Sequence, residues 1–185
     1  MDEASTSPLL GALADRLPGL RLRCEESEDL DFLQQLYAAV RAAELAQTGW
    51  TNTQKRAFTD AQFALQHRHY TDNYRGAEML VIERDGARIG RVCVCPFPAE
   101  IRLMDIALVE DHRGRGIGSS LLRAIIDIAR DRAVALTLHV EPENPAQRLY
   151  RRIGFRLIER RGIYDFLSLQ ATPETSTAPV ANPSS

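Results

Sequence analysis

Residues 101–132 read IRLMDIALVEDHRGRGIGSSLLRAIIDIARDR, and this stretch decides the expected fold. Its first part, Ile101 to Val109, has the apolar and β-branched character of a strand. From about Gly116 to Arg132, apolar residues recur at helical spacing, and Val134 to Glu141 follows as a nearly continuous apolar strand. A strand, a helix and a second strand in this order predict a right-handed parallel crossover.

The turn between the first strand and the helix, Arg113–Gly118, has the properties of an anion-binding site. Its three alternating glycines remove side chains where a ligand would approach backbone N–H groups. The start of the helix adds unpaired N–H donors and a partial positive charge, which suit a pyrophosphate. Arg113 and Arg115 can add charge-assisted hydrogen bonds to phosphate oxygens. A glycine-rich loop that binds nothing is the alternative. A Rossmann fingerprint would need the third glycine one position later, and a P-loop would need a lysine.

The other elements predict a mixed α/β sheet with helices on both faces. Before the turn we expect a strand at 20–24, a helix that Ser27 caps and that ends near Gln47, a helix over 53–70, and a hairpin of 79–83 and 87–95. After it we expect a short helix over 145–153 and one last strand from Phe155. The order β-α-α-β-β-β-α-β-α-β forms one domain over residues 20–170. Residues 1–19 are expected to be a flexible arm and residues 171–185 a disordered tail.

Composition excludes several classes of protein. The 185 residues are 44% hydrophobic, which is enough for one domain, and a net charge of −2 argues against a nucleic-acid partner. No apolar run approaches the ~20 residues of a membrane helix, and the N-terminus lacks a secretory signal pattern. Three cysteines argue against a disulfide framework, so we expect a cytoplasmic protein with no membrane partner. Cys93 and Cys95 are interpreted as core residues, and no cluster has metal-site spacing.

The pattern Arg-x-x-Gly-x-Gly at 113–118, after the strand Asp105–Val109, resembles the acetyl-CoA site of the GNAT superfamily of N-acetyltransferases. The stretch EPENPAQRLYRRIGF at 141–155 is similar to that family's segment of an Asn, an Ala, a Leu-Tyr pair and a Gly-Phe pair. The resemblance is strongest over 101–155 and weakest over 25–75, where the family varies with the acceptor. It implies a GNAT-like fold whose central strands, 101–109 and 134–140, splay apart, and acetyl-CoA as co-substrate without a metal.

The resemblance also implies roles for individual residues. Main-chain groups along the first central strand would pair with the pantetheine arm, backbone N–H groups of the turn would hold the pyrophosphate, Asn144 would contact pantetheine, and Tyr150 would lie near the thioester sulfur. The implied cofactor-binding set is Ile106, Ala107, Leu108, Val109, Arg113, Gly114, Arg115, Gly116, Ile117, Gly118, Ser119, Asn144 and Tyr150. Asn144 can also cap the following helix, Gly154 can end it, and Tyr150 can be a packing residue.

The implied reaction is direct attack of an amine on the thioester carbon. Tyr150 is the candidate donor to the leaving thiolate, although pKa values of about 10 for tyrosine and about 8.5 for a thiol make full proton transfer uphill. Asp105 is the first candidate for the general base, and an ion pair with a nearby arginine is its alternative role. Glu100, His139 and Glu141 are further candidates, His139 can instead be a core residue, and water can also take the proton.

The acceptor site is expected at the first two long helices and the loop between them. Its candidate residues are Tyr37, Glu44, Trp50, Phe58 and Gln62, for which ordinary helix packing is the alternative. The favoured hypothesis is an acetyltransferase for a primary amine of a small molecule or amino acid. An acetyltransferase for protein N-termini or lysines and a non-catalytic acyl-CoA-binding module are the alternatives. The acceptor, the acyl chain and a homodimer stay open.

Overall fold

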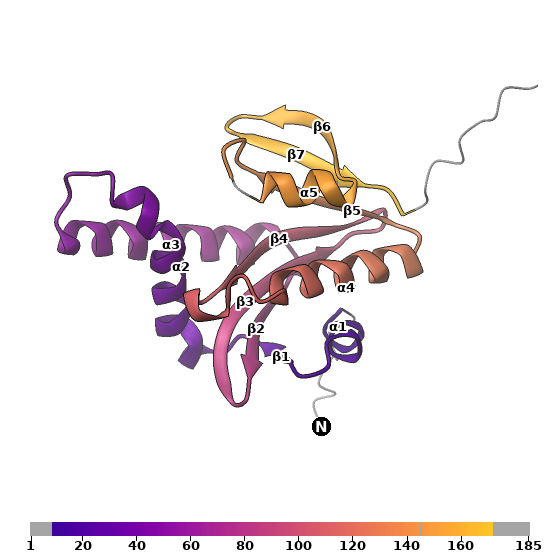
Figure 1. Ribbon diagram of the computed structural model, residues 1–185, viewed down its shortest axis with the longest axis horizontal. Coiled ribbons are helices and arrows are strands. Elements are labelled where there is room, and N and C mark those ends of the chain that lie inside the picture. Colours follow the sequence, from indigo (N-terminus) through magenta and orange to yellow (C-terminus); the bar gives the residue numbers. More distant parts are fainter. Residues whose placement is uncertain (1–8, 145, 172–185) are drawn as a thin grey trace, which may run out of the picture.

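The structure is a computed structural model that describes residues 9–144 and 146–171 (Figure 1). Its helices are α1 (Leu10–Arg16), α2 (Leu30–Leu45), α3 (Asn52–Asn73), α4 (Ile117–Asp131) and α5 (Gln147–Ile153). Its strands are β1 (Arg21–Cys24), β2 (Glu78–Arg84), β3 (Ala87–Pro96), β4 (Glu100–Leu108), β5 (Ala135–Val140), β6 (Arg156–Arg161) and β7 (Tyr164–Leu169). The strands form one sheet in the order β1-β2-β3-β4-β5-β7-β6. Only the β4–β5 pair is parallel, which confirms the predicted parallel unit over 101–140.

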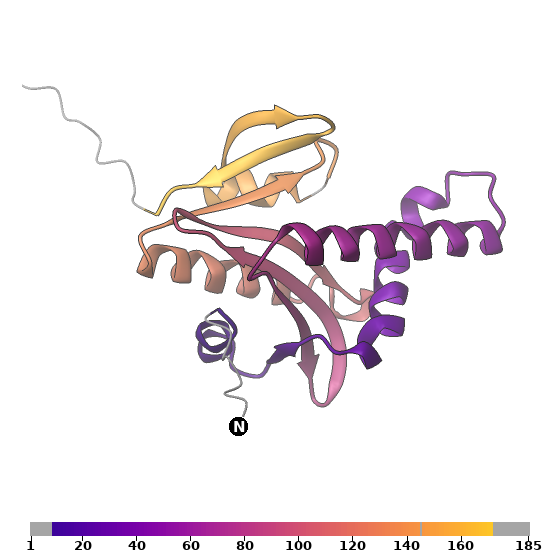
Figure 2. The same ribbon diagram turned by 180° about the vertical axis from the view of Figure 1, so that it is seen from behind.

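Helices cover both faces of the sheet, as predicted. α1, α4 and α5 lie on one face, and α2 and α3 cross the other (Figures 1 and 2). The apolar side of α4 buries Leu121 and Ile125 against the sheet, where Leu136 and Leu138 of β5 are also fully buried. Apolar burial between α4 and the sheet therefore holds the turn before α4 in a defined place.

The two central strands separate part-way along their length. β4 pairs with β5 only from Glu100↔Ala135 to Leu103↔Leu138. Beyond this point β4 pairs only with β3, and β5 pairs only with β7, so that β4 and β5 diverge (Figure 1). The structure thus confirms the splayed strands that the family resemblance implied. One edge of β4 after Leu103 has no strand beside it.

A β-bulge lies where the two strands part. In the β3–β4 ladder Cys93 pairs with Asp105 while Val94 pairs with Leu103, which leaves Met104 as an extra residue in β4. Tyr70 of α3 donates a hydrogen bond to the Met104 carbonyl at 3.2 Å. An extra residue changes which face the following side chains occupy, so the bulge decides where Asp105 points.

The N-terminal part of the chain differs from the expected flexible arm. Residues 10–16 form α1, and Leu9, Leu13 and Leu17 are buried in the main core. The N–H of Leu9 also donates to a carboxylate oxygen of Glu78 at 2.9 Å. The four-residue spacing of these leucines is a helical signal that the prolines on either side obscure. Residues 1–8 and the larger part of the predicted tail, 172–185, lie outside the described residues.

Three predicted elements differ from the structure in detail. A 3-10 turn, Ser27–Asp29, precedes α2, and its capping box of Glu26 and Asp29 stands where a Ser27 cap was expected. A second capping box, Thr51 with Gln54, starts α3 at Asn52, one residue before the approximate start that the sequence indicated. The expected last strand is a hairpin of β6 and β7, because Gly162 adopts a φ of +61° and reverses the chain.

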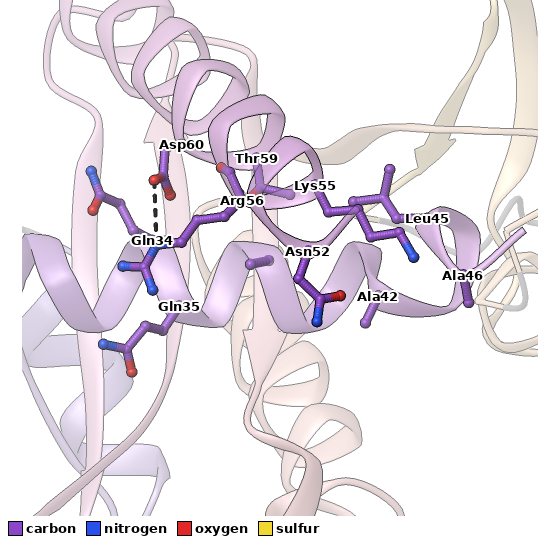
Figure 3. A pocket seen from close by; sticks show the side chains of 11 residues that line it. Gln34, Gln35, Ala42, Leu45, Ala46, Asn52, Lys55, Arg56, Thr59 and Asp60 are labelled. Atoms are coloured by element: carbon purple, nitrogen blue, oxygen red, sulfur yellow. Dashed lines mark hydrogen bonds and ion pairs between the residues drawn. The ribbon is translucent and has the colours of Figure 1, made fainter. Parts of the chain in front are cut away.

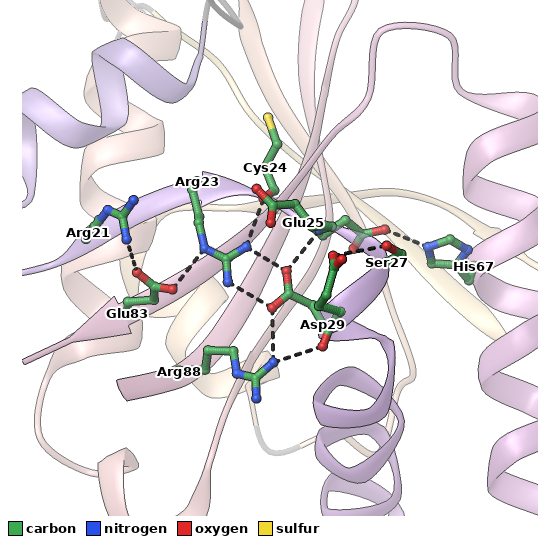
Figure 4. Close-up of polar contacts among 11 residues, drawn as sticks. Arg21, Arg23, Cys24, Glu25, Ser27, Asp29, His67, Glu83 and Arg88 are labelled. Carbon is green, nitrogen blue, oxygen red and sulfur yellow. Dashed lines mark hydrogen bonds and ion pairs between the residues drawn. The ribbon is translucent and has the colours of Figure 1, made fainter. Parts of the chain in front are cut away.

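A charged network joins the start of α2 to β1, β2 and β3 (Figure 4). Arg23 donates to both oxygens of Asp29, at 2.6 and 2.8 Å, and to Glu83 at 2.9 Å. Arg88 completes the network with an ion pair to Asp29 at 3.2 Å, and Arg21 with an ion pair to Glu83 at 2.8 Å. Glu25, next to this network, contacts His67 of α3 at 2.6 Å. The network fixes α2 against the sheet edge far from the diverging strands.

Candidate active site

The glycine turn presents the start of α4 without any side-chain cap. Gly116, the residue before α4, adopts a φ of +81°, and Gly114 adopts +70°, so both need the left-handed region. No side chain caps α4, and its first turn has no acidic residue, which leaves its first N–H groups open to an anion. At Gly118 a Cβ would lie 3.9 Å from Leu108, an ordinary contact, so neither backbone strain nor packing demands a glycine there.

The open edge of β4 leads directly to this turn. The Val109 N–H donates to the Ile89 carbonyl at 2.9 Å, so at this residue the backbone faces β3. Along an antiparallel strand the backbone N–H and C=O groups of successive residues point to opposite edges. Ile106 and Leu108 therefore point these groups to the open edge, while those of Ala107 point to β3. The Arg113 Nε donates to the Leu108 carbonyl at 2.8 Å, which holds the arginine beside the turn. Ile106 and Leu108 are therefore placed to pair with an extended ligand.

Tyr150 lies in the last turn of α5, whose end is fixed as predicted by Gly154 at a φ of +108°. The N–H groups of Gly154 and Phe155 both donate to the Tyr150 carbonyl, at 3.1 and 3.0 Å. The Tyr150 side chain is 8% exposed and packs edge-on against Phe155, with 5.5 Å between ring centroids. Burial raises the pKa of Tyr150, and the charge of Asp105 raises it further. Tyr150 therefore stays protonated and is a hydrogen-bond donor rather than a strong acid.

Asn144 shapes the loop before α5. Its side-chain oxygen accepts from the Ala146 N–H at 2.9 Å, and its carbonyl accepts from the Gln147 N–H at 3.0 Å. The helix itself begins at Gln147 and not at the predicted Pro145, which lies outside the described residues. Asn144 thus caps the turn ahead of the helix, and this bond leaves its side-chain NH₂ group free for a further contact.

The comparisons with known proteins agree with this geometry. The model of the Acetyltransferase (GNAT) family matches residues 39–155. The chain belongs to the GNAT family. A solved structure of the PaiA N-acetyltransferase from Thermoplasma acidophilum, in complex with coenzyme A, has the same fold, with a TM-score of 0.62, 16% identity, and coverage of 82% of this chain and 98% of that one.

Two curated relatives match parts of this GNAT chain. The N-alpha-acetyltransferase RimI of Mycobacterium tuberculosis is 34% identical over 103 residues, which are 56% of this chain and 61% of the relative. The streptothricin acetyltransferase of Streptomyces lavendulae is 38% identical over 73 residues, which are 38% of this chain and 39% of the relative. The matches therefore span between two fifths and three fifths of these relatives.

In this GNAT fold the first candidate base, Asp105, is bound to an arginine. The Arg91 Nε donates to Asp105 Oδ2 at 2.6 Å, and the Arg91 terminal nitrogen also contacts that oxygen. The Arg91 side chain is 4% exposed and the Asp105 side chain 26%. The first candidate base is therefore engaged by a permanent positive charge. Sequence analysis considered such a pair without identifying Arg91.

The other base candidates have different surroundings. Glu100 forms an ion pair with Arg102. His139 is half-buried and stacks on Phe166 with 4.8 Å between centroids. Burial and the charges of Arg102 and Arg161 lower the pKa of His139, so its ring is neutral at pH 7. Glu141 is exposed at the end of β5, where its charge acts on Arg41 of α2.

Tyr37 lies where several elements of the acceptor side meet. Its ring packs edge-on against Phe63 of α3, with 6.0 Å between centroids. Burial raises the pKa of Tyr37, and the charges of Arg41, Arg91 and Asp105 also act on it, as does Tyr164 at the start of β7. Sequence analysis found Tyr37 but missed Arg41 and Tyr164, because only the folded chain brings α2, β4 and β7 together.

The remaining acceptor candidates make other contacts. Glu44 pairs with Arg41 at 2.8 Å, and Trp50 packs edge-on against Phe58 with 5.2 Å between centroids. Trp50 and Phe58 belong to the α2–α3 corner, which projects beyond the sheet (Figure 2). Gln62 is half-buried on α3. Of the five candidates, Tyr37 is the one that shares an electrostatic environment with Asp105.

A groove of about 350 Å³ runs between α2 and α3 (Figure 3). Arg56 and Asp60 form an ion pair of 3.7 Å on its wall. It is lined by Gln34, Gln35, Ala38, Ala42, Leu45, Ala46, Asn52, Lys55, Arg56, Thr59 and Asp60. None of the predicted site residues lies in this lining, so the groove is separate from the glycine turn and from Tyr37.

Two findings concern other kinds of site. Within residues 9–144 and 146–171, no three His, Cys, Asp or Glu side chains are grouped so that they could hold a metal ion. In the same part of the chain no helix has the length and apolar character to span a membrane. The three cysteines are free, and Cys93 and Cys95 are buried as predicted.

Proposed function

We propose that this GNAT chain transfers the acetyl group of acetyl-CoA to a primary amine, with the α-amino group of a protein or peptide N-terminus as acceptor. The observation that carries the proposal is the open edge of β4, which ends at the uncapped start of α4. Ile106 and Leu108 would pair with the pantetheine arm, and the N–H groups at residues 117–119 would bind the pyrophosphate. The side-chain NH₂ of Asn144 would contact pantetheine.

The chemistry needs one bond made, one bond broken and two protons moved. The neutral amine nitrogen forms a bond to the thioester carbon, and the carbon–sulfur bond breaks. The nitrogen loses one proton to a base or to water, and the leaving thiolate gains one. Tyr150, which burial keeps protonated, would donate a hydrogen bond to the sulfur as the negative charge develops.

The ionisation of the acceptor itself favours an α-amine over a lysine. At pH 7 an α-amino group of pKa about 8 is roughly 10% neutral, whereas a lysine of pKa about 10.4 is roughly 0.04% neutral. The partial match to the RimI N-alpha-acetyltransferase supports the same acceptor.

A small-molecule amine is the second candidate acceptor. The partial match to the streptothricin acetyltransferase supports it, over a shorter part of this chain than the RimI match. Neither match fixes the acceptor, because α2, α3 and the β6–β7 hairpin form the acceptor side and the family varies there.

The test is a CoA-release assay with acetyl-CoA and a panel of amines. Peptides with a free N-terminus are expected to react, while the same peptides with a blocked N-terminus and a free lysine are not. A response limited to small amines would favour the second candidate. Binding of acetyl-CoA without any release would leave a binding module, and failure to bind acetyl-CoA would refute the enzyme.

Tyr150→Phe tests the proposed donor. Removing the hydroxyl is expected to lower kcat about ten-fold or more and leave the acetyl-CoA affinity unchanged. Tyr74→Phe is the matched control, because Tyr74 ends α3 and packs on Phe97 at 6.4 Å, away from α5. A Tyr150→Phe turnover equal to that of the control would remove Tyr150 from the mechanism.

A further inference from the structure

Arg91 is a buried charge in the middle of the sheet. It lies on β3 opposite Ala107 and is 3% exposed. An arginine in such a place needs partners, because an unpaired buried charge costs several kcal/mol. Its guanidinium pairs with Asp105 of β4, donates to Gln66 Oε1 of α3 and lies 5.6 Å from the centroid of the Phe63 ring. Three side chains from two elements, β4 and α3, therefore hold it in one orientation.

The contacts of Arg91 fall on one oxygen of the carboxylate. Both of its nitrogens that reach Asp105 contact Oδ2. Within the part of the chain that the structure describes, no hydrogen bond reaches Asp105 Oδ1. A carboxylate oxygen accepts two hydrogen bonds, so Oδ1 keeps its full capacity for a ligand.

The charge of Asp105 acts on both sides of the diverging strands. It influences Tyr150 of α5 on one face of the sheet, and Tyr37 of α2 on the other. It also influences Tyr70 on α3 and Arg91 and Cys93 on β3. Among these groups, Arg91 carries a permanent positive charge. Asp105 is thus within electrostatic reach of Tyr150, the proposed donor to the leaving sulfur, and of Tyr37 on the acceptor side.

We infer that Arg91 is a positioning residue, which holds the Asp105 carboxylate through Oδ2 and leaves Oδ1 free to accept a hydrogen bond from the acceptor amine. Asp105 then orients the amine, and the proton that the amine loses passes to water or another base. The inference deepens the proposed function and rests on it. Gln66 and Phe63 support the role, because they hold the flat guanidinium against α3 and directed at Oδ2.

The first test measures Asp105 directly, without activity. Crystal structures of the wild type, Arg91→Gln and Arg91→Lys are compared at the Asp105 side chain. The carboxylate is expected to leave its position in Arg91→Gln, because its partner at Oδ2 is lost, and to keep it in part in Arg91→Lys, which keeps a charge but not the fork. An unchanged carboxylate in Arg91→Gln would overturn the inference.

The second test is a double-mutant cycle in the acetyl-transfer assay. Arg91→Gln and Asp105→Asn are each expected to raise KM for the acceptor about ten-fold at pH 6.5, with a smaller effect on kcat. The double variant is expected to be no worse than Asp105→Asn alone, because Arg91 acts through Asp105. Additive losses would contradict this.

The matched control is Arg88→Gln, which also removes an arginine of β3 that pairs with an aspartate, Asp29. It is expected to leave the acceptor KM and the position of the Asp105 carboxylate unchanged. A wild type that binds acetyl-CoA but acetylates no amine would refute the proposed function. The crystal structures would then still decide whether Arg91 holds Asp105 in place.

Discussion

Two buried arginine–aspartate pairs of this chain differ in how completely the carboxylate is used. Asp29 is 1% exposed, and its two oxygens accept from Arg23 twice, from Arg88 and from the Glu26 N–H, at 2.6–3.2 Å. Asp105 accepts from Arg91 on one oxygen and presents the other beside the diverging strands. A saturated carboxylate can only hold the fold together, whereas a half-used one can also bind a ligand.

The largest expected effect is on stability, from Asp29→Asn. The amide turns an NH₂ group toward arginine donors, so the free energy of unfolding should fall by about 3 kcal/mol or more. The melting temperature should then fall by roughly 6–12 °C in a calorimetric scan. The kcat/KM of the folded enzyme should not change. If Asp29→Asn folds fully but has a lower kcat/KM, then Asp29 also serves the reaction and the proposed difference between the two pairs is wrong.

Acid should weaken the saturated network. Hydrogen bonds from Arg23 lower the pKa of Asp29. Burial raises the pKa of Glu83, but the hydrogen bond from Arg23 opposes this effect and the pKa is lowered overall. A carboxyl group whose pKa is lower in the folded state stabilises the protein above its unfolded pKa of about 4, and this contribution is lost as the pH falls further. The melting temperature should therefore drop between pH 5 and pH 3 (roughly the titration range of free carboxyl groups). The drop should be smaller in Asp29→Asn, and equal slopes would contradict the assignment.

Asp105→Asn should have a smaller effect on stability than Asp29→Asn. Its amide oxygen can face Arg91, and its NH₂ group can occupy the open position of Oδ1. The change leaves the buried Arg91 without a counter-ion, but the hydrogen bonds that the amide oxygen keeps should hold the loss in the free energy of unfolding below that of Asp29→Asn, as measured by urea denaturation. A loss as large as that of Asp29→Asn would show that Asp105 is mainly structural.

The smallest expected effects on stability distinguish Gly116 from Gly118 in the turn. Gly116→Ala should cost about 1 kcal/mol of stability, because its φ of +81° strains a residue with a Cβ. Gly118→Ala should leave the melting temperature unchanged, since its Cβ would have ordinary contacts. It should nevertheless weaken acetyl-CoA binding about ten-fold in calorimetry, if the backbone there approaches the pyrophosphate. Unchanged affinity would place the ligand elsewhere.

The site could be predicted from sequence only where its signals are local. The turn at 113–118 and the C-cap at Gly154 are contiguous patterns, and both were recognised before folding was considered. Trp50 and Phe58 are predicted acceptor residues because they belong to the loop and the second long helix, where Trp50 could pack on a cationic amine. In the fold they pack against each other at the α2–α3 corner. Aromatic side chains that pack on each other and aromatic side chains that line a pocket have the same pattern in the sequence.

By itself, the sequence determined the parallel crossover, most of the strands and helices, and the glycine-rich turn before α4, because periodicity and backbone freedom act over a few residues. Only the tertiary structure decided that the leucines of α1 join the core, and that Arg91 meets Asp105. The second contact depends on the β3–β4 register and on the extra residue Met104, which turns Asp105 to the face of Arg91. A shift of one residue in that register would send the two charges to opposite faces, and register is settled by the packing of the whole sheet.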